Sequence, residues 1–419
     1  MASNVPGFRP QSQLFWKFLM VMKITWKKEM NSSHQASFDI ENPYAPLVNS
    51  LQEELESLSP LSSGCNIYKV PEALREVNAR AYTPRVVSIG PLHYGKEGLK
   101  AKEEHKKSDK FAEIILIDAA FVIELLLRSR FDELKGESER ICVQDVRVDM
   151  LCLENQVPFF ILEDLFDPDK VTGLSQHDNI IELSSKFFKR TIQGRRTEDN
   201  LSSTRLTEVK HFVDLVRLLH LPSKEQGKGE VETVKAPTVT ELHQAGVKFK
   251  AGSSSNLFDI QFNEDEGILE IPKLTVGFAT EVQLRNIIAY EQLYRKERYM
   301  NDYVVFIDRL VSTPKDVDLL IKYGIIENFR GDSNEAATLI NNLARGALFK
   351  RKRFYFASVC DGLNKYYRTS WHRWKANLKQ NYFNTPWAII SFIAAVVLLL
   401  LTLTQTINSL ITISWGKQN

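Results

Sequence analysis

The C-terminal part of this chain holds a long stretch without a charged residue, and this stretch limits the possible folds more than any other feature. It runs from Trp387 to Trp415, and its first part reads WAIISFIAAVVLLLL. A helix rises about 1.5 Å per residue, so roughly 20 apolar residues cross the hydrocarbon core of a bilayer. The alternative is a buried helix of a soluble core, but such a helix usually carries a polar stripe. The sequence therefore predicts a transmembrane helix over residues 386–413.

The charges on either side of this stretch predict the orientation of the chain. Four basic residues precede it, whereas the tail after it offers only Lys417. Basic flanks tend to stay in the cytosol. We therefore expect a single-pass, tail-anchored membrane protein, in the plasma membrane, with its large N-terminal body in the cytosol. The preceding basic residues are Arg368, Arg373, Lys375 and Lys379.

An N-terminal segment offers the opposite orientation. Leu14–Trp26 resembles a secretory signal, but Lys17 and Lys23 interrupt its apolar run. A signal core needs about 7–15 consecutive apolar residues, so the segment is a poor match. The sequons at Asn31 and Asn200 would carry glycans only if the body left the cytosol.

Composition excludes several classes of protein. Apolar residues make up 43% of the chain and charged residues 25%, which is typical of a folded protein with a core. The 54 Lys and Arg nearly balance the 52 Asp and Glu, so we expect no nucleic-acid partner. The four cysteines form no C-x-x-C pair, and no histidines are spaced for a helical metal site. We expect neither a metal nor a cofactor.

Periodicity divides the body into two mostly helical halves. We expect a flexible arm over residues 1–45, an N-terminal half over 46–222, a linker over 223–237 and a C-terminal half over 238–384. Alternating residues at Leu257–Phe262 and Ile268–Ile271 predict a hairpin, and Arg85–Ile89 predicts a strand. The predicted fold class is mainly α, an irregular multi-helix body with a small β-hairpin. Helices are predicted at Leu47–Leu61, Lys102–Lys135, Val146–Phe166, Lys186–Ile192, Thr207–His220, Thr240–Ala245, Glu281–Arg298, Asn301–Val311, Pro314–Tyr323, Ser333–Leu348 and Arg353–Gln380.

Polar residues inside apolar stretches are the candidates for chemistry. The sequence contains no phosphate-binding glycine loop, nucleophile elbow or zinc-protease motif. Asp118 falls on the apolar face of a predicted helix, and Glu154, Asn155 and Gln156 follow a buried run. A buried carboxylate needs a partner, or its pKa rises. These residues form either a polar centre in a cleft or a buried network that ties helices together, and we favour the network.

Several blocks follow one another along the sequence, among them IYKVPEALREVNARAYTPRVVSIGPLHYG (67–95), VDMLCLENQVPFFILEDLF (148–166), LFDIQFNEDEGILEIPKLTV (257–276) and YFNTPWAIISFIAAVVLLLLTLTQT (382–406). Together, in this order, they resemble the plant domain-of-unknown-function family 247. The resemblance covers almost everything from residue 47 onward. It implies a plant protein with a mainly helical body, a C-terminal membrane helix and no established enzymatic activity. Some members look like recognition components of self-incompatibility in grasses, and others are associated with stress and defence.

Three hypotheses about function follow. The first is a membrane-anchored scaffold for recognition or signalling that binds unidentified proteins through exposed loops. Its candidate loops are Pro91–Gly95, which includes His93, and Asn263–Gly267, which includes Glu264 and Asp265. The second is an enzyme that uses Asp118 and Glu154, with His93 or His211. The third is a passive organiser that self-associates through helices. We expect the first, and no enzymatic activity.

Overall fold

A computed structural model describes most of the body and the C-terminal helix. The predicted arm and the predicted helix at Leu47–Leu61 lie outside the described residues. The described residues are 68–93, 108–131, 134, 137–171, 173–175, 178–189, 209–222, 229–230, 236–254, 256–348, 350–369 and 386–416.

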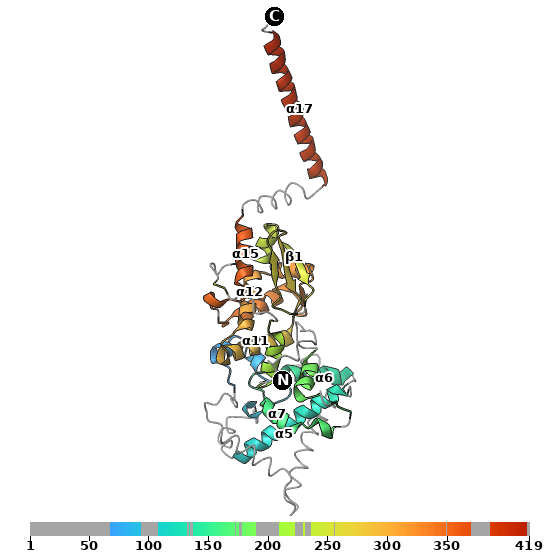
Figure 1. The fold of residues 1–419 in the computed structure, drawn as a ribbon, viewed down its shortest axis with the longest axis vertical. Coiled ribbons are helices and arrows are strands. Elements are labelled where there is room, and N and C mark those ends of the chain that lie inside the picture. The colour runs from blue at the N-terminus through green and yellow to red at the C-terminus, as the bar shows by residue number, and fades with distance from the viewer. Residues whose placement is uncertain are drawn as a thin grey trace, which may run out of the picture.

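The N-terminal half consists of helices joined by irregular segments (Figure 1). Two of its helices begin at side-chain caps. Asn179 Oδ1 accepts from Glu182 N at 2.8 Å, and His211 Nδ1 accepts from Asp214 N at 3.2 Å. Such caps satisfy N–H groups that the first turn leaves without a partner. The elements are α3 Glu72–Arg75, η1 Ala79–Tyr82, η2 Pro91–His93, α5 Ser108–Arg130, α6 Glu137–Asp149, α7 Phe159–Leu165, η3 Pro168–Lys170, α8 Ile180–Phe188 and α9 Phe212–His220.

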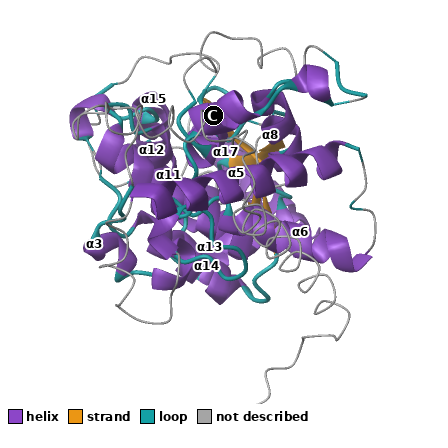
Figure 2. Ribbon diagram, turned by 90° about the horizontal axis from the view of Figure 1, so that it is seen from below, coloured by secondary structure: helices purple, strands orange, loops and turns teal. Residues whose placement is uncertain are grey.

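Helices also dominate the C-terminal half, and short local signals mark where they begin. Thr238 and Glu241 form a capping box before α10, and Pro314 occupies the first turn of α13 after Thr313. Figure 2 shows that helices make up most of the described body and strands only a small part. The helices are α10 Val239–Gln244, α11 Phe278–Tyr294, α12 Tyr299–Leu310, α13 Pro314–Lys322, α14 Ser333–Ala344, η6 Arg351–Arg353 and α15 Ala357–Arg368.

Two small sheets complete this half. In the first, β3 (Ile268–Pro272) pairs antiparallel with β2 (Gln261–Asn263) and parallel with β1 (Lys248–Gly252). In the second, β4 (Leu274–Val276) pairs parallel with β5 (Ile326–Asn328). The β2–β3 pair confirms the predicted hairpin. The strand β1, which the sequence pattern did not indicate, turns the hairpin into a three-stranded sheet.

Helix α11 lies between the two halves and joins them (Figure 1). Most of its residues are buried, which is typical of a helix enclosed on all sides. Its Asn286 donates to Ala81 O and accepts from Leu153 N, each at 2.7 Å. One continuous apolar core contains Val122 of the N-terminal half and Phe306 of the C-terminal half. The two halves therefore share a single core.

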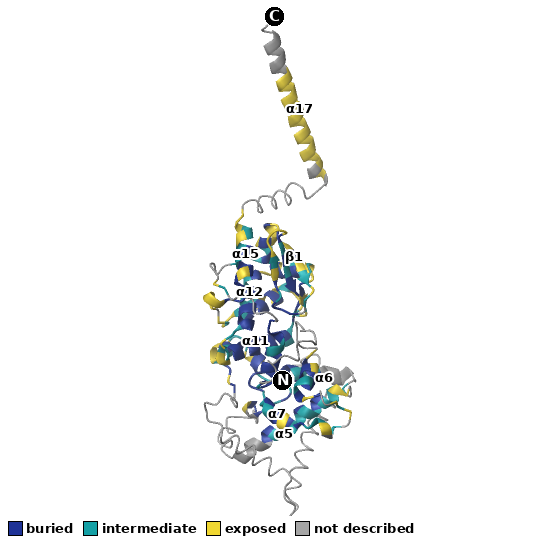
Figure 3. Cartoon of the chain, in the orientation of Figure 1, coloured by how far each residue is buried: buried dark blue, intermediate teal, exposed yellow. Residues whose placement is uncertain are grey.

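The C-terminal helix α17 (Pro386–Gly416) matches the predicted span. Its segment Ile390–Asn408 is long and apolar enough to cross a membrane, and none of that segment is buried against the rest of the chain. Figure 3 shows its described side chains as exposed, in contrast to the buried interior of the body. Exposed leucines on this scale favour a lipid surrounding over water. The predicted fold class, mainly α with a small sheet and one C-terminal candidate span, is confirmed.

Three sequence predictions about local structure are wrong in detail. Arg85–Ile89 forms no strand, because side chains rather than a neighbouring strand hold its backbone N–H groups. Val146–Phe166 is not one interrupted helix, because α6 ends at Asp149 and α7 starts only after Pro158. The helix expected at Lys186–Ile192 starts earlier, at Ile180, where Asn179 caps it.

Candidate functional site

The predicted polar positions of the N-terminal half surround one irregular segment, residues 68–93. Four side chains accept hydrogen bonds from its backbone, and a fifth, Gln156, orders the adjacent loop; we call these five side chains the polar frame. Four of them are buried and Gln156 is half-buried. The polar frame consists of Asp118, Asp149, Glu154, Asn155 and Gln156.

Asp149 fixes the part of the segment that was predicted to be a strand. Its carboxylate accepts from the backbone N–H groups of Arg85, Val86 and Val87 at 2.9, 2.6 and 2.9 Å. Burial raises the pKa of Asp149 above its ordinary value, and the three donors act in the opposite direction. One side chain thus replaces the hydrogen bonds that a strand partner would supply.

Asn155 and Asp118 continue this arrangement along the segment. Asn155 Oδ1 accepts from Ile89 N at 2.6 Å, and its Nδ2 donates to Val87 O at 3.0 Å. Asp118 Oδ2, on α5, accepts from Gly90 N at 2.7 Å. Gly90 has φ +77°, and a Cβ there would lie 2.4 Å from the carbonyl oxygen of Gln156. The chain therefore passes very close to the polar frame at Gly90.

Glu154 contacts both ends of residues 68–93, whereas Gln156 orders the loop that contains it. Glu154 Oε1 accepts from Val70 N at 2.8 Å, and its Oε2 lies 2.5 Å from an Arg75 nitrogen and 3.7 Å from His93 Nε2. Gln156 Nε2 donates to two carbonyl oxygens of its own loop at 2.7 Å. His93 is buried beside Glu154, whereas its neighbour Leu92 is exposed. Pro91 begins η2.

The acidic hairpin tip lies apart from the polar frame, in the sheet near α15 (Figure 1). Glu264 and Asp265 are exposed, and Glu264 forms an ion pair with Lys365 of α15 at 2.8 Å. A Cβ on Gly267, whose φ is +63°, would lie 2.4 Å from the hydroxyl of Tyr366. The hairpin is therefore packed closely against α15, and its acidic tip faces solvent.

A second buried polar cluster was not foreseen from the sequence. Glu291 of α11 accepts from Met300 N at 2.9 Å, from Asn301 Nδ2 at 3.1 Å and from Arg217 Nε at 3.1 Å. Burial raises the pKa of Glu291, opposed by the charge of Arg217. The signal was present in the sequence, since Asn286 and Glu291 interrupt the apolar run of α11.

Asp149 was also missed, although its position is unusual. It is the last residue of α6, where an acidic side chain meets the negative end of the helix dipole. A negative charge in that place interacts unfavourably with the helix dipole, and the three N–H donors offset this interaction.

His211, the base of the enzyme hypothesis, is also buried. Burial lowers its pKa to about 3, and its ring packs edge-on against Tyr68 and Tyr290.

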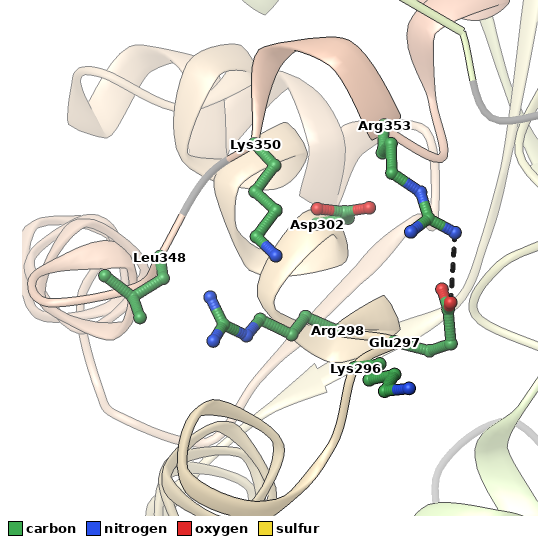
Figure 4. Close-up of a pocket in the computed structure, with 7 residues that line it drawn as sticks. All are labelled: Lys296, Glu297, Arg298, Asp302, Leu348, Lys350 and Arg353. Carbon is green, nitrogen blue, oxygen red and sulfur yellow. Dashed lines mark hydrogen bonds and ion pairs between the residues drawn. The ribbon is translucent and has the colours of Figure 1, made fainter.

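Two hollows in the body have polar walls. The larger has a volume of about 750 Å³, and its lining includes Asp308, Asn341, Asn364 and Tyr367. Burial raises the pKa of Asp308. The smaller, which we call the basic hollow, is shown in Figure 4. Asp118, Glu154 and His93 line neither of them. The basic hollow is lined by Lys296, Glu297, Arg298, Asp302, Leu348, Lys350 and Arg353.

Metal chemistry finds no support in the part of the chain that the structure describes. Within those residues, no group of three or more His, Cys, Asp or Glu side chains could hold a metal ion. Cys152 and Cys360 are free and both are buried.

Comparison with known proteins identifies the family. The family described as "Plant protein of unknown function", DUF247, matches residues 67–108 and 107–401. The chain belongs to the DUF247 family. This match includes the polar frame, the basic hollow and the first part of α17.

Two relatives of this DUF247 protein come from Arabidopsis thaliana. The UPF0481 protein At3g47200 is 27% identical over 414 residues, which cover 82% of this chain and 85% of the relative. The putative UPF0481 protein At3g02645 is 22% identical over 511 aligned positions. That alignment covers 90% of this chain and 96% of the relative. No solved structure matches this chain.

Proposed function

We propose that this DUF247 protein is a membrane-tethered scaffold for recognition or signalling, whose body lies in the cytosol and binds other proteins. The observation that carries the proposal is α17. Its apolar side chains have no cover from the body, with Leu399 70% exposed and Leu403 60% exposed. A helix of this kind confines the body to a membrane surface and so raises its effective concentration toward other membrane proteins.

The polar frame favours recognition over catalysis. Asp118 and Glu154, the carboxylates of the enzyme hypothesis, each accept a hydrogen bond from a backbone N–H of a distant segment. A buried carboxylate with such partners stabilises the fold. The exposed groups lie elsewhere, at Leu92 and at the acidic tip of the hairpin. These are the surfaces that we assign to partner binding.

Topology is the first test. An N-terminally tagged full-length protein in intact membranes should lose its tag to added protease and show no mobility shift with a glycosidase. A protected tag, together with a glycosidase shift that depends on Asn31 or Asn200, would overturn the cytosolic orientation. It would instead make Leu14–Trp26 a working signal.

Partner binding is the second test. Asp265→Ala with Glu266→Ala, combined with Leu92→Ser, removes exposed groups and should reduce the recovery of proteins that co-purify with the full-length chain. Lys273→Ala is the matched control, since Lys273 is equally exposed and lies outside both loops. Unchanged recovery of every partner by the combined variant would remove these loops from the proposal.

The enzyme hypothesis stays a prediction and makes a different demand. His93 Nε2 lies 3.7 Å from Glu154 Oε2, so a histidine and a carboxylate are close together in the N-terminal half. Asp118→Asn keeps an acceptor for Gly90 N–H while removing the charge. The scaffold proposal expects this variant to keep its partners and its cellular effect. Retention of every partner with loss of the cellular effect would instead favour catalysis.

A further inference from the structure

The basic hollow gathers positive charge between two segments that are distant in sequence. One segment is the turn between α11 and α12, and the other contains η6. Of the charged side chains that line the hollow, four are basic and two are acidic, which leaves an excess of two positive charges. Figure 4 shows Lys350 and Arg298 reaching toward the same space, while Arg353 turns toward Glu297. Like charges that converge in this way repel one another unless an anion lies between them.

Both acidic side chains already have partners. Glu297 forms an ion pair with Arg353 at 3.1 Å. Asp302 Oδ2 accepts from Tyr355 N at 3.0 Å. The negative charge of Asp302 still repels an anion in the hollow. However, the hydrogen bond from Tyr355 N directs the Asp302 carboxylate toward the backbone before α15. The acids therefore neutralise only part of the positive charge.

Three of the basic groups remain available. Lys296 and Lys350 are exposed, and within the described residues neither forms an ion pair. The Arg298 guanidinium donates to Gln292 O at 3.3 Å, which fixes its direction. Its Nε is buried and has no acceptor among the described residues. An oriented guanidinium and two ammonium groups suit the oxygens of a phosphate.

We infer that the basic hollow binds a phosphate monoester, and that in the cell this phosphate belongs to the headgroup of an anionic membrane lipid. A phosphate monoester carries about 1.5 to 2 negative charges near neutral pH, which matches the excess positive charge of the hollow. The recognition depends on side chains. The first N–H groups of α12, at Met300 and Asn301, already donate to Glu291.

Size and tethering point to a lipid as the source of the phosphate. The enclosed space is only about 20 Å³, so phosphate oxygens enter it while the rest of the molecule stays outside. A headgroup at a membrane surface meets this requirement. The chain between Arg368 and Pro386 spans at most roughly 60 Å, so α17 keeps the body within reach of headgroups. Anionic lipids are concentrated in the cytosolic leaflet, so this assignment rests on the proposed orientation.

The test uses the full-length chain in lipid nanodiscs of two compositions. One contains phosphatidylcholine alone, and the other adds a minor fraction of phosphatidylinositol phosphate. The readout is hydrogen exchange of the backbone at residues 295–298 and 350–353. We expect protection of both segments in the second discs and not in the first, and we expect inorganic phosphate added to the first discs to protect the same segments more weakly.

Matched variants locate the effect. Lys296→Gln with Lys350→Gln should weaken the response to phosphatidylinositol phosphate by roughly tenfold to thirtyfold. Lys273→Gln with Lys322→Gln removes two exposed lysines elsewhere and should respond like the unmodified chain. Equal responses from both double variants would overturn the site, since the attraction would then be general.

Two other outcomes of the nanodisc experiment would overturn part or all of the inference. Protection by inorganic phosphate without any effect of the lipid would overturn the lipid source and indicate a soluble phosphorylated ligand. No protection under either condition would overturn the inference as a whole. Nanodiscs expose both membrane faces, so this result does not depend on cellular orientation. A failed topology test would therefore reject the proposed function separately from the phosphate site.

Discussion

Residues 68–93 and the capped starts of the helices fix their backbones in different ways. Residues 68–93 are held by side chains that lie far away in sequence, such as Asp149, which is 62 to 64 positions from the residues it binds. In the C-terminal half, helices begin at caps only three residues apart, as at Thr238 with Glu241 and at Asp332 with Glu335. Residues 68–93 therefore depend on tertiary contacts, whereas the start of each of these helices depends on a side chain only three positions away.

This difference has consequences for stability. Removal of a local cap frees one or two N–H groups at an exposed helix end, where water replaces the lost acceptor. Removal of a polar-frame side chain leaves buried N–H groups without an acceptor, in a place that water cannot readily reach. We therefore expect polar-frame variants to lower the free energy of unfolding more than cap variants do.

The largest effect is expected at Asp149. Asp149→Ala removes the acceptor for three backbone N–H groups and should lower the free energy of unfolding by about 3–5 kcal/mol. Asp149→Asn keeps one oxygen acceptor and should lose less. Urea denaturation of the full-length chain in detergent measures both, and hydrogen exchange at residues 85–89 should rise in both variants. An alanine variant as stable as the parent would remove Asp149 from the polar frame.

A smaller effect is expected at Gly90. Gly90→Ala should cost about 2–4 kcal/mol, because it combines a left-handed backbone with a close approach to Gln156. Gly324→Ala is the control, since Gly324 has φ +69° and nothing within 4 Å of a new Cβ. It should cost only about 1 kcal/mol. Equal losses in thermal unfolding would show that the contact with Gln156 contributes nothing.

His211 takes part in a local cap and in a tertiary contact, because it caps α9 and packs against Tyr68. Its folded-state pKa of about 3 lies below the value near 6.5 of an exposed histidine, so unfolding takes up a proton below about pH 6.5. Stability should therefore be full above pH 6.5 and fall as the pH drops toward 4, by up to about 1.4 kcal/mol per pH unit. His211→Asn keeps a cap and should flatten this slope in denaturation curves. If His211→Asn leaves the slope of stability against pH unchanged, that slope arises from other titrating groups.

The smallest effect is expected at a local cap. Thr238→Ala should lower the free energy of unfolding by about 1 kcal/mol, because it removes the Oγ1 acceptor of one backbone N–H, that of Glu241. Thr238→Ser keeps the hydroxyl and should be close to neutral. A loss from Thr238→Ala as large as that from Asp149→Ala would contradict the distinction between local caps and the polar frame.

The same distinction explains what could be predicted from the sequence. Thr313 followed by Pro314, and the alternation before and after the acidic residues 264–266, are local patterns, and the helix and hairpin that they predict are present. The charge-free stretch from Trp387 likewise predicted α17. Each of these depends on neighbours within a few positions, which a sequence displays directly.

The polar frame could be predicted only in part. Asp118 and Glu154 stand out as charges in apolar surroundings, but the backbone groups that they bind, at Gly90 and Val70, become neighbours only after folding. Arg85–Ile89 was mistaken for a strand because its β-branched residues suit a sheet, while the carboxylate that holds it belongs to α6. The basic hollow joins Arg298 and Lys350, whose approach no spacing indicates.

The packing of the hairpin against α15 has a mechanical consequence. The chain continues from the last residue of α15, Arg368, toward the candidate membrane helix α17, so any pull on α17 would enter the body through α15. Beside this end lie the ion pair of Lys365 with Glu264 and the edge-on contact of Tyr366 with Phe262, 5.6 Å between ring centres. With α17 held in a bilayer, tension on it would reach these contacts between α15 and the hairpin before it reached the residues around α5.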